Sequence, residues 1–497
     1  MDAALVETHV SVVVFVGDHV YKLKKPVRFP FADLSTREAR EAMCHREVEL
    51  NRRLARDVYE GVIDLVGPDG EVCDHLVAMR RMPDDRRLAR LIVERDRRAG
   101  PAMDAIARVL ARFHDGADRS PEISSAATPD AVLERWRRND AQMRPFVGSC
   151  FERGDLDRVR DLVDRFVEGR HPLFEQRIAA GQICDGHGDL LADDVFLLDD
   201  GPRILDCIEF DDRLRHVDVI DDLAFLAMDV ERLGAPHLAA ALVVAYERAS
   251  GSAAPAGLLD LYVAYRAQVR AMVAALRSSQ DEDAASRATH EADARALLAR
   301  CLRHLDSATV RLVVVGGLPG TGKTTVARGI ADRTGWLVLR SDELRKRLTG
   351  RAPETPAAAP FGEGIYTAEL SDRTYEAMLD AARESLVAGR SVVLDASFTA
   401  DRHRVAARAL AQETASELVE IQCTVAADEA ARRMWERHDL GLDASDADPI
   451  VAARLAQVSD PWPGCTVLPT DRPIAAVVDD AIAIAGAVSL ETAGPEV

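Results

Sequence analysis

The sequence predicts two domains of different fold class, a two-lobed α+β domain followed by an α/β domain with a parallel sheet. Three observations support this prediction. The chain has 497 residues, which is more than a single hydrophobic core usually holds. Strand patterns near the N-terminus give way to helical patterns, as expected for two lobes of different content. From Arg311 onward, apolar strands, loops and helices alternate, as they do when helices cover a parallel sheet.

The composition is that of a globular protein, with 47% hydrophobic and 29% charged residues. The formal net charge of −20 argues against nucleic acid as a partner. Eight cysteines without a C-x-x-C pair indicate neither a zinc site nor a disulfide framework. We expect a cytoplasmic protein that does not enter membranes, because the N-terminus lacks the basic region of a signal peptide and no apolar stretch is long enough to cross a bilayer. The oligomeric state stays open.

The first predicted domain, residues 1–305, has one lobe rich in strands and one rich in helices. Its first predicted elements are two strands within residues 10–25, a helix at 36–56, and strands at 62–66 and 75–82. From about residue 101 the pattern is helical, apart from strand-like runs near residues 183–211.

Lysine is rare in this chain. It occurs at five positions, and Lys22, Lys24 and Lys25 lie on one predicted strand. Because side chains alternate along a strand, Val20, Lys22 and Lys24 would share one face. A chain that otherwise uses arginine is expected to keep lysine where a compact ammonium group matters. The alternative is a solvated strand end, which the lysines on their own would favour.

Three aspartates stand in the strand-like region near residues 183–211. Asp189 belongs to a His-Gly-Asp sequence, Asp194 follows it, and Asp206 ends the next predicted strand. Phosphoryl transfer to a hydroxyl needs one carboxylate that accepts the proton and others that bind Mg²⁺. Asp189 fits the first role, and Asp194 and Asp206 fit the second. The alternative is a loop rich in aspartate because aspartate suits turns.

A nucleotide-binding loop opens the second predicted domain, residues 306–485. An apolar strand, a glycine-rich turn and a helix follow one another there, and the turn matches G-x-x-x-x-G-K-[ST]. In this pattern backbone N–H groups surround the phosphates of ATP or GTP, the lysine reaches the β/γ oxygens, and the hydroxyl holds Mg²⁺. The predicted nucleotide-binding residues are Gly317, Leu318, Pro319, Gly320, Thr321, Gly322, Lys323, Thr324 and Thr325, with Thr324 also on the metal.

Two further strands of the second domain lead to acidic residues. Asp342 follows one strand, with Arg345 one helical turn later, and Asp395 ends another. Asp342 can accept a proton from an attacking hydroxyl, and Arg345 can hold an anionic group. A helix N-cap explains the Ser-Asp sequence equally well. Asp395 could orient Mg²⁺, or it could be a turn residue at a strand end.

A later helix carries Arg432, Arg433 and Arg437. These arginines could close over the phosphates as a lid, or they could form a solvated helix face. Residues 486–497 are predicted to be a disordered tail.

The P-loop, the S-D-x-x-R and V-V-L-D-A-[ST] motifs and the arginine-bearing helix together resemble a family of small P-loop kinases. This family includes polynucleotide kinase, gluconate kinase, chloramphenicol phosphotransferase and zeta-toxin-like proteins, and the resemblance covers about residues 310–485. It implies that Asp342 is the general base, Arg345 a substrate or phosphate contact, and Arg437 a lid arginine.

The first domain resembles the aminoglycoside phosphotransferases, which share the protein-kinase fold. Their motifs H-G-D-x(4)-N, [IL]-x-D and D-x-x-x-D-L-A are matched by HGDLLADD, ILD and DVIDDLA, with Asp194 in place of the asparagine. The kinase order of strand lysine, helix glutamate, catalytic loop and metal aspartate is also present, with Glu47 available to pair with Lys22. The whole chain is similar to a group of bacterial two-domain proteins, whose strings VYK-x-KKPV and D-x-IEF-x-DR recur as VYKLKKPV and DCIEFDDR.

These patterns predict a tandem kinase that uses ATP and Mg²⁺ to phosphorylate hydroxyls of small molecules such as sugars or aminocyclitols. Three alternatives stay open. The first domain could sense a ligand or nucleotide in a regulatory ATPase, the second domain could act on nucleic-acid ends, or the chain could be a nucleotide-binding scaffold without turnover.

Overall fold

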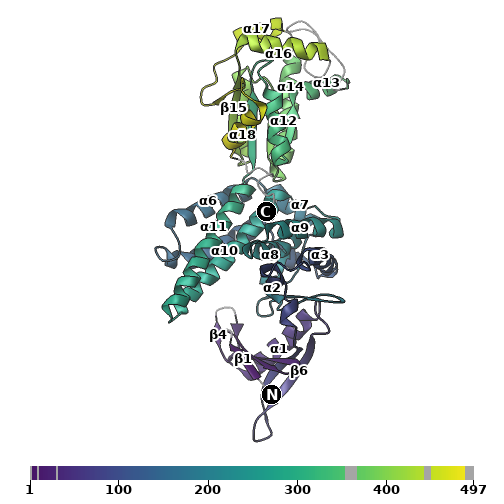
Figure 1. Cartoon of the computed structure of the whole chain (residues 1–497), viewed down its shortest axis with the longest axis vertical. Helices are drawn as coiled ribbons and strands as arrows, with labels where there is room; N and C mark the ends of the chain where they lie inside the picture. The colour runs from purple at the N-terminus through teal and green to yellow at the C-terminus, as the bar shows by residue number, and fades with distance from the viewer. Residues whose placement is uncertain are drawn as a thin grey trace. The chain divides into compact units, whose positions relative to one another are not determined.

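The computed structural model describes residues 3–7, 10–29, 32–253, 255–352, 367–440 and 449–486 (Figure 1). The chain forms two compact units. The first unit comprises residues 1–156, 174–254 and 259–302, and the second comprises residues 157–173, 255–258 and 303–497. The domain boundaries that we predicted near residues 305 and 485 stay predictions. Apart from residue 486, the predicted tail lies outside the described residues.

The first unit begins with an antiparallel sheet of strand order β1-β2-β3-β7-β6. Its strands are β1 (Ala3–Glu7), β2 (Ser11–Val16), β3 (His19–Lys24), β6 (Tyr59–Val66) and β7 (Val72–Arg80), and a small separate pair is β4 (Arg28–Phe29) with β5 (Ala32–Asp33). Helix α1 (Arg37–Asn51) begins after Thr36, whose hydroxyl accepts a hydrogen bond from the Ala39 N–H. Val20, Val48 and Val77 join in one hydrophobic cluster that holds α1 against the sheet. The strands and helix predicted here are confirmed.

Helices dominate the chain from residue 88 to residue 308. They are α2 (Leu88–Val93), α3 (Ala99–Gly116), α4 (Pro121–Ser125), α5 (Pro129–Met143), α6 (Arg153–Glu168), α7 (His171–Ala179), α8 (Val219–Arg232), α9 (Pro236–Ser250), α10 (Ala256–Gln280) and α11 (Ala284–Ala308). Two short antiparallel pairs interrupt them, β8 (Ile183–Asp185) with β11 (His216–Asp218) and β9 (Val195–Leu198) with β10 (Gly201–Ile204). Helix α8 is buried along nearly its whole length and is the core of this lobe. The predicted two-lobed α+β class is confirmed.

The second unit is built on a parallel sheet of order β13-β14-β12-β15-β16. Its strands are β12 (Arg311–Gly316), β13 (Leu337–Arg340), β14 (Val392–Asp395), β15 (Glu417–Thr424) and β16 (Thr466–Pro469). Its helices are α12 (Lys323–Thr334), α13 (Ser341–Leu348), α14 (Ala368–Val387), α15 (Asp401–Glu413), α16 (Ala427–Leu440), α17 (Pro449–Val458) and α18 (Ile474–Ile484). The chain order reverses direction on the two sides of β12, so ligands are expected at the carboxyl end of this strand. The predicted α/β class is confirmed.

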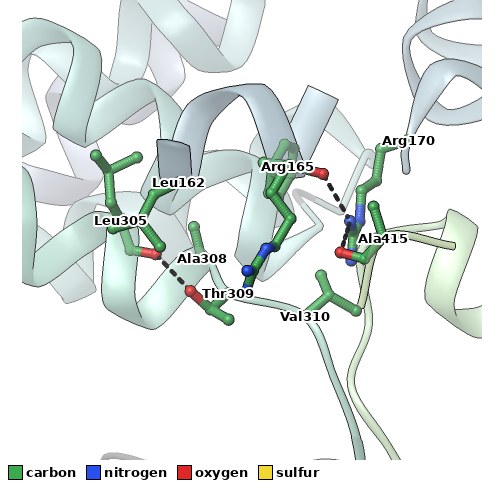
Figure 2. A pocket seen from close by; sticks show the side chains of 9 residues that line it. Leu162, Arg165, Arg170, Leu305, Ala308, Thr309, Val310 and Ala415 are labelled. Carbon is green, nitrogen blue, oxygen red and sulfur yellow. Dashed lines mark hydrogen bonds between the residues drawn. The ribbon is translucent and has the colours of Figure 1, made fainter. Parts of the chain in front are cut away.

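Residues 157–173 belong to the second unit although they lie far from it in sequence. Arg170 is almost completely buried there, and its Nη1 donates to the carbonyl of Ala415 at 3.3 Å (Figure 2). Burial lowers the pKa of this guanidinium to about 10. The adjoining cavity of about 10 Å³ has room for one water molecule at most. We therefore interpret Arg170 as a packing residue at the C-terminal end of α15.

No helix within the described ranges is long and apolar enough to cross a membrane.

The core of the second unit yields a stability prediction. Ile330 on α12 is completely buried among apolar side chains from β12, β14 and α18. Ile330→Ala should reduce the free energy of unfolding by about 2–5 kcal/mol, because it removes buried methyl groups and leaves a cavity. Chemical denaturation measures this change. Val405→Ala is the control, since Val405 is 51% exposed on the same unit and its truncation should change stability by about 0.5 kcal/mol or less. Equal losses for the two variants would contradict the packing described here.

Candidate active sites

Strand β3 and helix α1 bring two lysines and a glutamate together in the first unit. The Lys22 Nζ lies 2.9 Å from Glu47 Oε1, and the Lys24 Nζ lies 2.5 Å from Glu47 Oε2. Both lysines reach the same carboxylate because they share one face of β3, as the alternation of side chains predicts. Glu47 is completely buried, so these contacts offset the cost of removing its charge from water. The predicted pair of Lys22 with Glu47 is present.

Two more carboxylates reach this cluster from the segment after β10. Asp206 Oδ1 lies 2.7 Å from the Lys22 Nζ, and Glu209 Oε1 lies 2.5 Å from the Lys24 Nζ. Burial alone would lower the pKa of Lys22, but the charges of Asp206 and Glu47 raise that pKa well above its usual value. The Lys22 ammonium is therefore charged throughout the physiological pH range.

Our sequence reasoning missed Glu209. It lies in the DCIEFDDR segment, and the similarity of that string to other two-domain proteins was the one signal that could have marked it. Its contact with the nearly buried Lys24 attaches this segment to β3.

A buried network holds the loop between β8 and β9, which carries Asp189. The N–H groups of His187 and Gly188 donate to the two carboxylate oxygens of Asp222, at 2.7 and 2.9 Å. Asp222 also lies 3.1 Å from the Nε2 of His114. Burial alone would raise the pKa of Asp222, but its contacts with His114 and His187 hold that pKa well below its usual range. Asp222, from the D-x-x-x-D-L-A string, is therefore a charged acceptor that holds the loop backbone in place.

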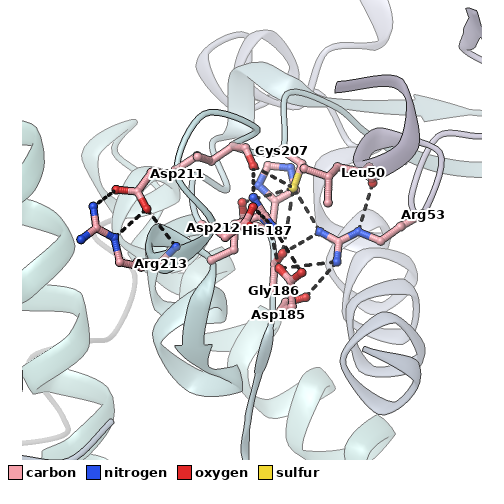
Figure 3. Close-up of polar contacts among 12 residues, drawn as sticks. Leu50, Arg53, Asp185, Gly186, His187, Cys207, Asp211, Asp212 and Arg213 are labelled. Atoms are coloured by element: carbon pink, nitrogen blue, oxygen red, sulfur yellow. Dashed lines mark hydrogen bonds and ion pairs between the residues drawn. The ribbon is translucent and has the colours of Figure 1, made fainter. Parts of the chain in front are cut away.

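Arg53, just after α1, also holds this loop, through hydrogen bonds to its carbonyl groups (Figure 3). Its Nη1 donates to the carbonyl of Asp185 at 2.9 Å, and its Nη2 donates to the carbonyl of Gly186 at 2.8 Å. Gly188 completes the turn with a φ of 88°, and a Cβ at this position would lie 2.9 Å from the Leu214 carbonyl oxygen. Only glycine combines this positive φ with the absence of a Cβ, so the sequence fixes the backbone conformation of the loop at this position.

Asp189 and Asp194 are half-buried on this loop. Burial, opposed by Arg270 and reinforced by Asp206, raises the pKa of Asp189 to about 6. Burial and the charges of Asp206 and Asp189 raise the pKa of Asp194 well above its usual value. The three carboxylates therefore lie within electrostatic reach of one another, and a divalent cation among them would relieve their repulsion.

Asp206 adopts a left-handed backbone conformation with a φ of 64°. Such a conformation costs a non-glycine residue of order 1–3 kcal/mol and occurs often at functional sites. Its side chain is 52% exposed, and Lys22 holds its pKa below the usual value. This exposed, ionised carboxylate suits Mg²⁺, yet the part of the chain that the structure describes holds no group of three or more His, Cys, Asp or Glu side chains that could bind a metal. The metal roles of Asp194 and Asp206 stay predictions.

The predicted nucleotide loop joins β12 to α12 in the second unit. Strand β12 is completely buried, and α12 begins at Lys323. Gly317, Gly320 and Gly322 all have positive φ angles. A Cβ at Gly320 would lie 2.6 Å from the Ala430 carbonyl oxygen, so a larger residue does not fit. The loop therefore has the backbone conformation of an anion-binding loop that precedes a helix N-terminus.

The remaining loop residues lie in the same turn. The Thr321 hydroxyl donates to the Leu318 carbonyl at 2.7 Å and closes the turn, which also contains Pro319. Thr324 and Thr325 follow in the first turn of α12, where Thr325 is exposed. The phosphate contacts of these residues stay predictions.

Asp395 ends β14 beside the P-loop and is 4% exposed. Burial raises its pKa, while Lys323, Thr324 and Arg340 act in the opposite direction. Asp395 Oδ2 accepts a hydrogen bond from Arg340 Nε at 3.1 Å, whereas Oδ1 is buried without a hydrogen bond to any described residue. A buried acceptor of this kind next to Thr324 suits Mg²⁺ or its water shell, so these residues fit the metal that we predicted.

Asp342 and Arg345 lie one turn apart on α13, and Arg345 Nη1 donates to Asp342 Oδ1 at 2.9 Å. Two aromatic residues that sequence reasoning missed adjoin them. The rings of Tyr375 and His403 stack with centroids 3.7 Å apart, and the charges of Arg345 and Asp342 both act on the pKa of Tyr375, which burial raises. The sequence motifs did not mark Tyr375 or His403, because these residues lie on α14 and α15, which carry none of the motifs. The general-base role of Asp342 stays a prediction.

A cavity of about 390 Å³ opens beside the P-loop, a volume that suits a nucleotide. It is lined by Gly320, Gly322, Thr325, Arg433, Thr470 and Val478, among others. Arg433 Nη2 donates to the Thr470 carbonyl at 3.0 Å, and the Thr470 hydroxyl donates to the Thr321 carbonyl at 2.8 Å. The predicted lid helix α16 is thus connected to the P-loop through Thr470. Arg432 pairs instead with Glu429 and Glu436, and the side chain of Arg437 lies outside the described residues.

The buried network of the first unit yields the second prediction. Asp222→Ala should lower the free energy of unfolding by about 3–5 kcal/mol, because it leaves two buried N–H groups and His114 without their partner. Chemical denaturation measures this loss. Asp193→Ala is the control, since Asp193 is exposed on the same loop and its removal should change stability by about 0.5 kcal/mol or less. A loss below about 1 kcal/mol for Asp222→Ala would contradict its role in holding the loop.

Comparisons with known proteins found one family model and several solved structures that are similar to parts of this chain. A family model described as an AAA domain matches residues 312–461. The solved GDP and kanamycin complex of APH(2")-IIia is similar at 15% identity, covering 59% of this chain and 92% of that chain, with a TM-score of 0.39. A solved gluconokinase from Sinorhizobium meliloti 1021 is similar at 20% identity, covering 36% of this chain and 91% of that chain, with a TM-score of 0.26.

A relative is similar over nearly the whole chain. Uncharacterized protein Rv2004c of Mycobacterium tuberculosis is 43% identical over 456 residues, which are 92% of this chain and 90% of that protein. The match spans both units, so the predicted similarity to bacterial two-domain proteins is confirmed. The chain belongs to the same family as this mycobacterial protein.

Proposed function

We propose that this chain is a phosphotransferase with two active centres, each of which transfers the γ-phosphoryl group of ATP to a hydroxyl of a small molecule. The convergence of Lys22, Glu47 and Asp206 beside the Asp189 loop carries the proposal for the first unit. The glycine loop, Asp395 and the adjoining cavity support it for the second. The net charge of −20 favours a small acceptor, such as a sugar or an aminocyclitol, over a nucleic-acid end. The reactions would take place in the cytoplasm.

In the first centre, Lys22 would bind phosphate oxygens of ATP while Glu47 holds its ammonium group in position. Asp189 would accept the proton of the acceptor hydroxyl as the hydroxyl oxygen bonds to the γ-phosphorus and the bond from that phosphorus to ADP breaks. A pKa near 6 leaves Asp189 ionised at neutral pH and more basic than an ordinary carboxylate. Mg²⁺, bound by Asp194 and Asp206, would neutralise phosphate charge.

In the second centre, the backbone N–H groups of the glycine loop and Lys323 would hold the phosphates of ATP. Thr324 and Asp395 would hold Mg²⁺ and its water shell. Asp342 would accept the acceptor proton, and its hydrogen bond to Arg345 keeps the carboxylate in place until an anionic group of the substrates engages that arginine. The neighbouring rings of Tyr375 and His403 would form part of the acceptor site.

Paired variants test whether there are two centres. ATP consumption is screened over sugars, aminoglycosides and nucleosides with the wild type, Asp189→Ala and Lys323→Ala. Each variant should lose a different activity by about a hundredfold or more, because each removes a group that acts on only one reaction. Asp193→Ala serves as the control for the first unit.

Two other results would decide against this proposal. If every activity survives Asp189→Ala and is lost with Lys323→Ala, the first unit is a regulatory, ligand-sensing domain. If no acceptor supports turnover and ATP still binds, the chain is a nucleotide-binding scaffold.

The raised pKa of Asp189 predicts a pH profile for the first centre. The general base must be ionised, so kcat/KM in a Lys323→Ala background should fall about tenfold per pH unit below about pH 6. Measurements between about pH 4.5 and pH 8 with the first acceptor found would show the break. A rate that stays constant down to about pH 5 would contradict the role of Asp189 as the base.

A further inference from the structure

The first unit carries a large open groove that the proposed phosphotransfer does not use. Segment 52–57 after α1, helix α3 and the turn between β9 and β10 form its walls, and its volume is about 1020 Å³. Six arginines line it: Arg52, Arg53, Arg56, Arg108, Arg112 and Arg203. The two aspartates in its lining leave a net formal charge of +4. This is a local inversion of charge in a chain whose net charge is −20.

The acidic groups of the groove are already neutralised. Asp57 accepts from Arg203 Nε at 2.7 Å and from Arg80 Nη2 at 2.8 Å. Asp200 accepts from Arg203 Nη2 at 2.7 Å. The two aspartates of the lining therefore do not compete for the exposed arginines Arg56, Arg108 and Arg112.

These three arginines have no polar partner among the described residues. Arg56, Arg108 and Arg112 are exposed, and their side chains form no ion pair or hydrogen bond with a described residue. Arg108 and Arg112 are four residues apart on α3, so their side chains lie on the same helix face. By contrast, Arg53 holds the Asp189 loop and Arg203 is bound to two aspartates. Guanidinium groups that are exposed, clustered and unpaired are suited to bind anions bidentately.

The remaining lining indicates what kind of anion fits. Among the described residues that line the groove, the one aromatic ring is that of Phe113, which the Arg53 guanidinium covers at 5.0 Å, and the apolar contacts come from aliphatic residues such as Leu54 and Val109. This part of the lining therefore offers no free ring for base stacking, on which single-stranded nucleic-acid sites depend. A long polyanion would also extend beyond the groove to the rest of an acidic protein, which repels it. A compact anion avoids this repulsion, because salt screens charges more than about 8–10 Å away.

We propose that this groove is a binding site for a compact, multiply phosphorylated anion, a chain of three or more phosphates, separate from both nucleotide centres. Arg56, Arg108 and Arg112 bind its phosphate oxygens, while Arg53 and Arg203 shape the site. The groove also shares Arg53 with the loop that carries Asp189, so the ligand would bind next to a residue that positions this loop.

Titration of the full-length protein with inorganic tripolyphosphate, followed by isothermal calorimetry without Mg²⁺, tests the proposal. Three proteins are compared: the wild type, Arg108→Ala/Arg112→Ala, and the control Arg248→Ala/Arg277→Ala, which removes two exposed arginines of the same unit outside the groove. Any binding at the nucleotide centres is common to all three, so their difference reports on the groove. The groove variant should bind at least about tenfold more weakly at this site, because it loses two charge-assisted contacts. The control should match the wild type.

Arg56→Ala is a second, independent variant, from a different wall of the groove, and it should weaken the same site. Alanine is a good helix former, and thermal unfolding checks that each variant is folded. Identical titrations for the wild type and both groove variants would overturn the proposal. So would orthophosphate binding as tightly as tripolyphosphate, or arginine-dependent binding of a 20-nucleotide RNA without binding of tripolyphosphate, which would assign the groove to nucleic acid.

Discussion

The organisation of the first unit depends on one buried carboxylate. Glu47 is excluded from water and lies between two ammonium groups. Its carboxylate therefore cannot move without separating buried opposite charges. Removing either lysine would leave three carboxylates facing a single ammonium group, an imbalance that is more costly than the pair itself is stabilising. A slip of β3 by one residue would turn both lysines to the opposite face. Glu47 therefore fixes the register of β3 and the placement of α1, and through Lys24 and Glu209 it also fixes the segment that carries Asp206.

The Asp189 loop follows the same physical rule with backbone groups in place of lysines. Asp222 is a buried carboxylate whose charge is satisfied by two loop N–H groups and by His114. Arg53 supplies the complementary half, since it donates to loop carbonyls. A loop held at both its donors and its acceptors needs little reorganisation when a substrate arrives. The strain that Asp206 accepts in its backbone is tolerated because its surroundings are fixed in this way.

Local patterns were sufficient where a residue's role is set by its own strand or turn. The alternation of lysines in β3 and the glycine turn after β12 follow from spacing in the sequence, whereas the pairing of Lys22 with Glu47 was predicted from the kinase order of the motifs. The structure adds what spacing cannot supply. Glu209 and Asp222 act through partners more than 30 residues away, and Tyr375 meets His403 from another helix. Residues 157–173 have an ordinary helical pattern, and periodicity does not reveal that they join the second unit.

Under the proposed function, the two units would bind phosphate in different ways. In the second unit, backbone N–H groups of the glycine loop would surround the phosphates together with Lys323, and the Ala430 carbonyl leaves no room for a side chain at Gly320. In the first unit, the proposed phosphate contact is a side chain alone, Lys22, whose pKa Asp206 and Glu47 raise against the effect of burial. A phosphate site made only of side chains depends on the register and burial of distant segments. A phosphate site made of backbone N–H groups depends on the conformation of one turn. Activity at the proposed first centre would therefore depend on the folding of the whole unit. A ligand that stabilises this unit would affect the first centre most directly.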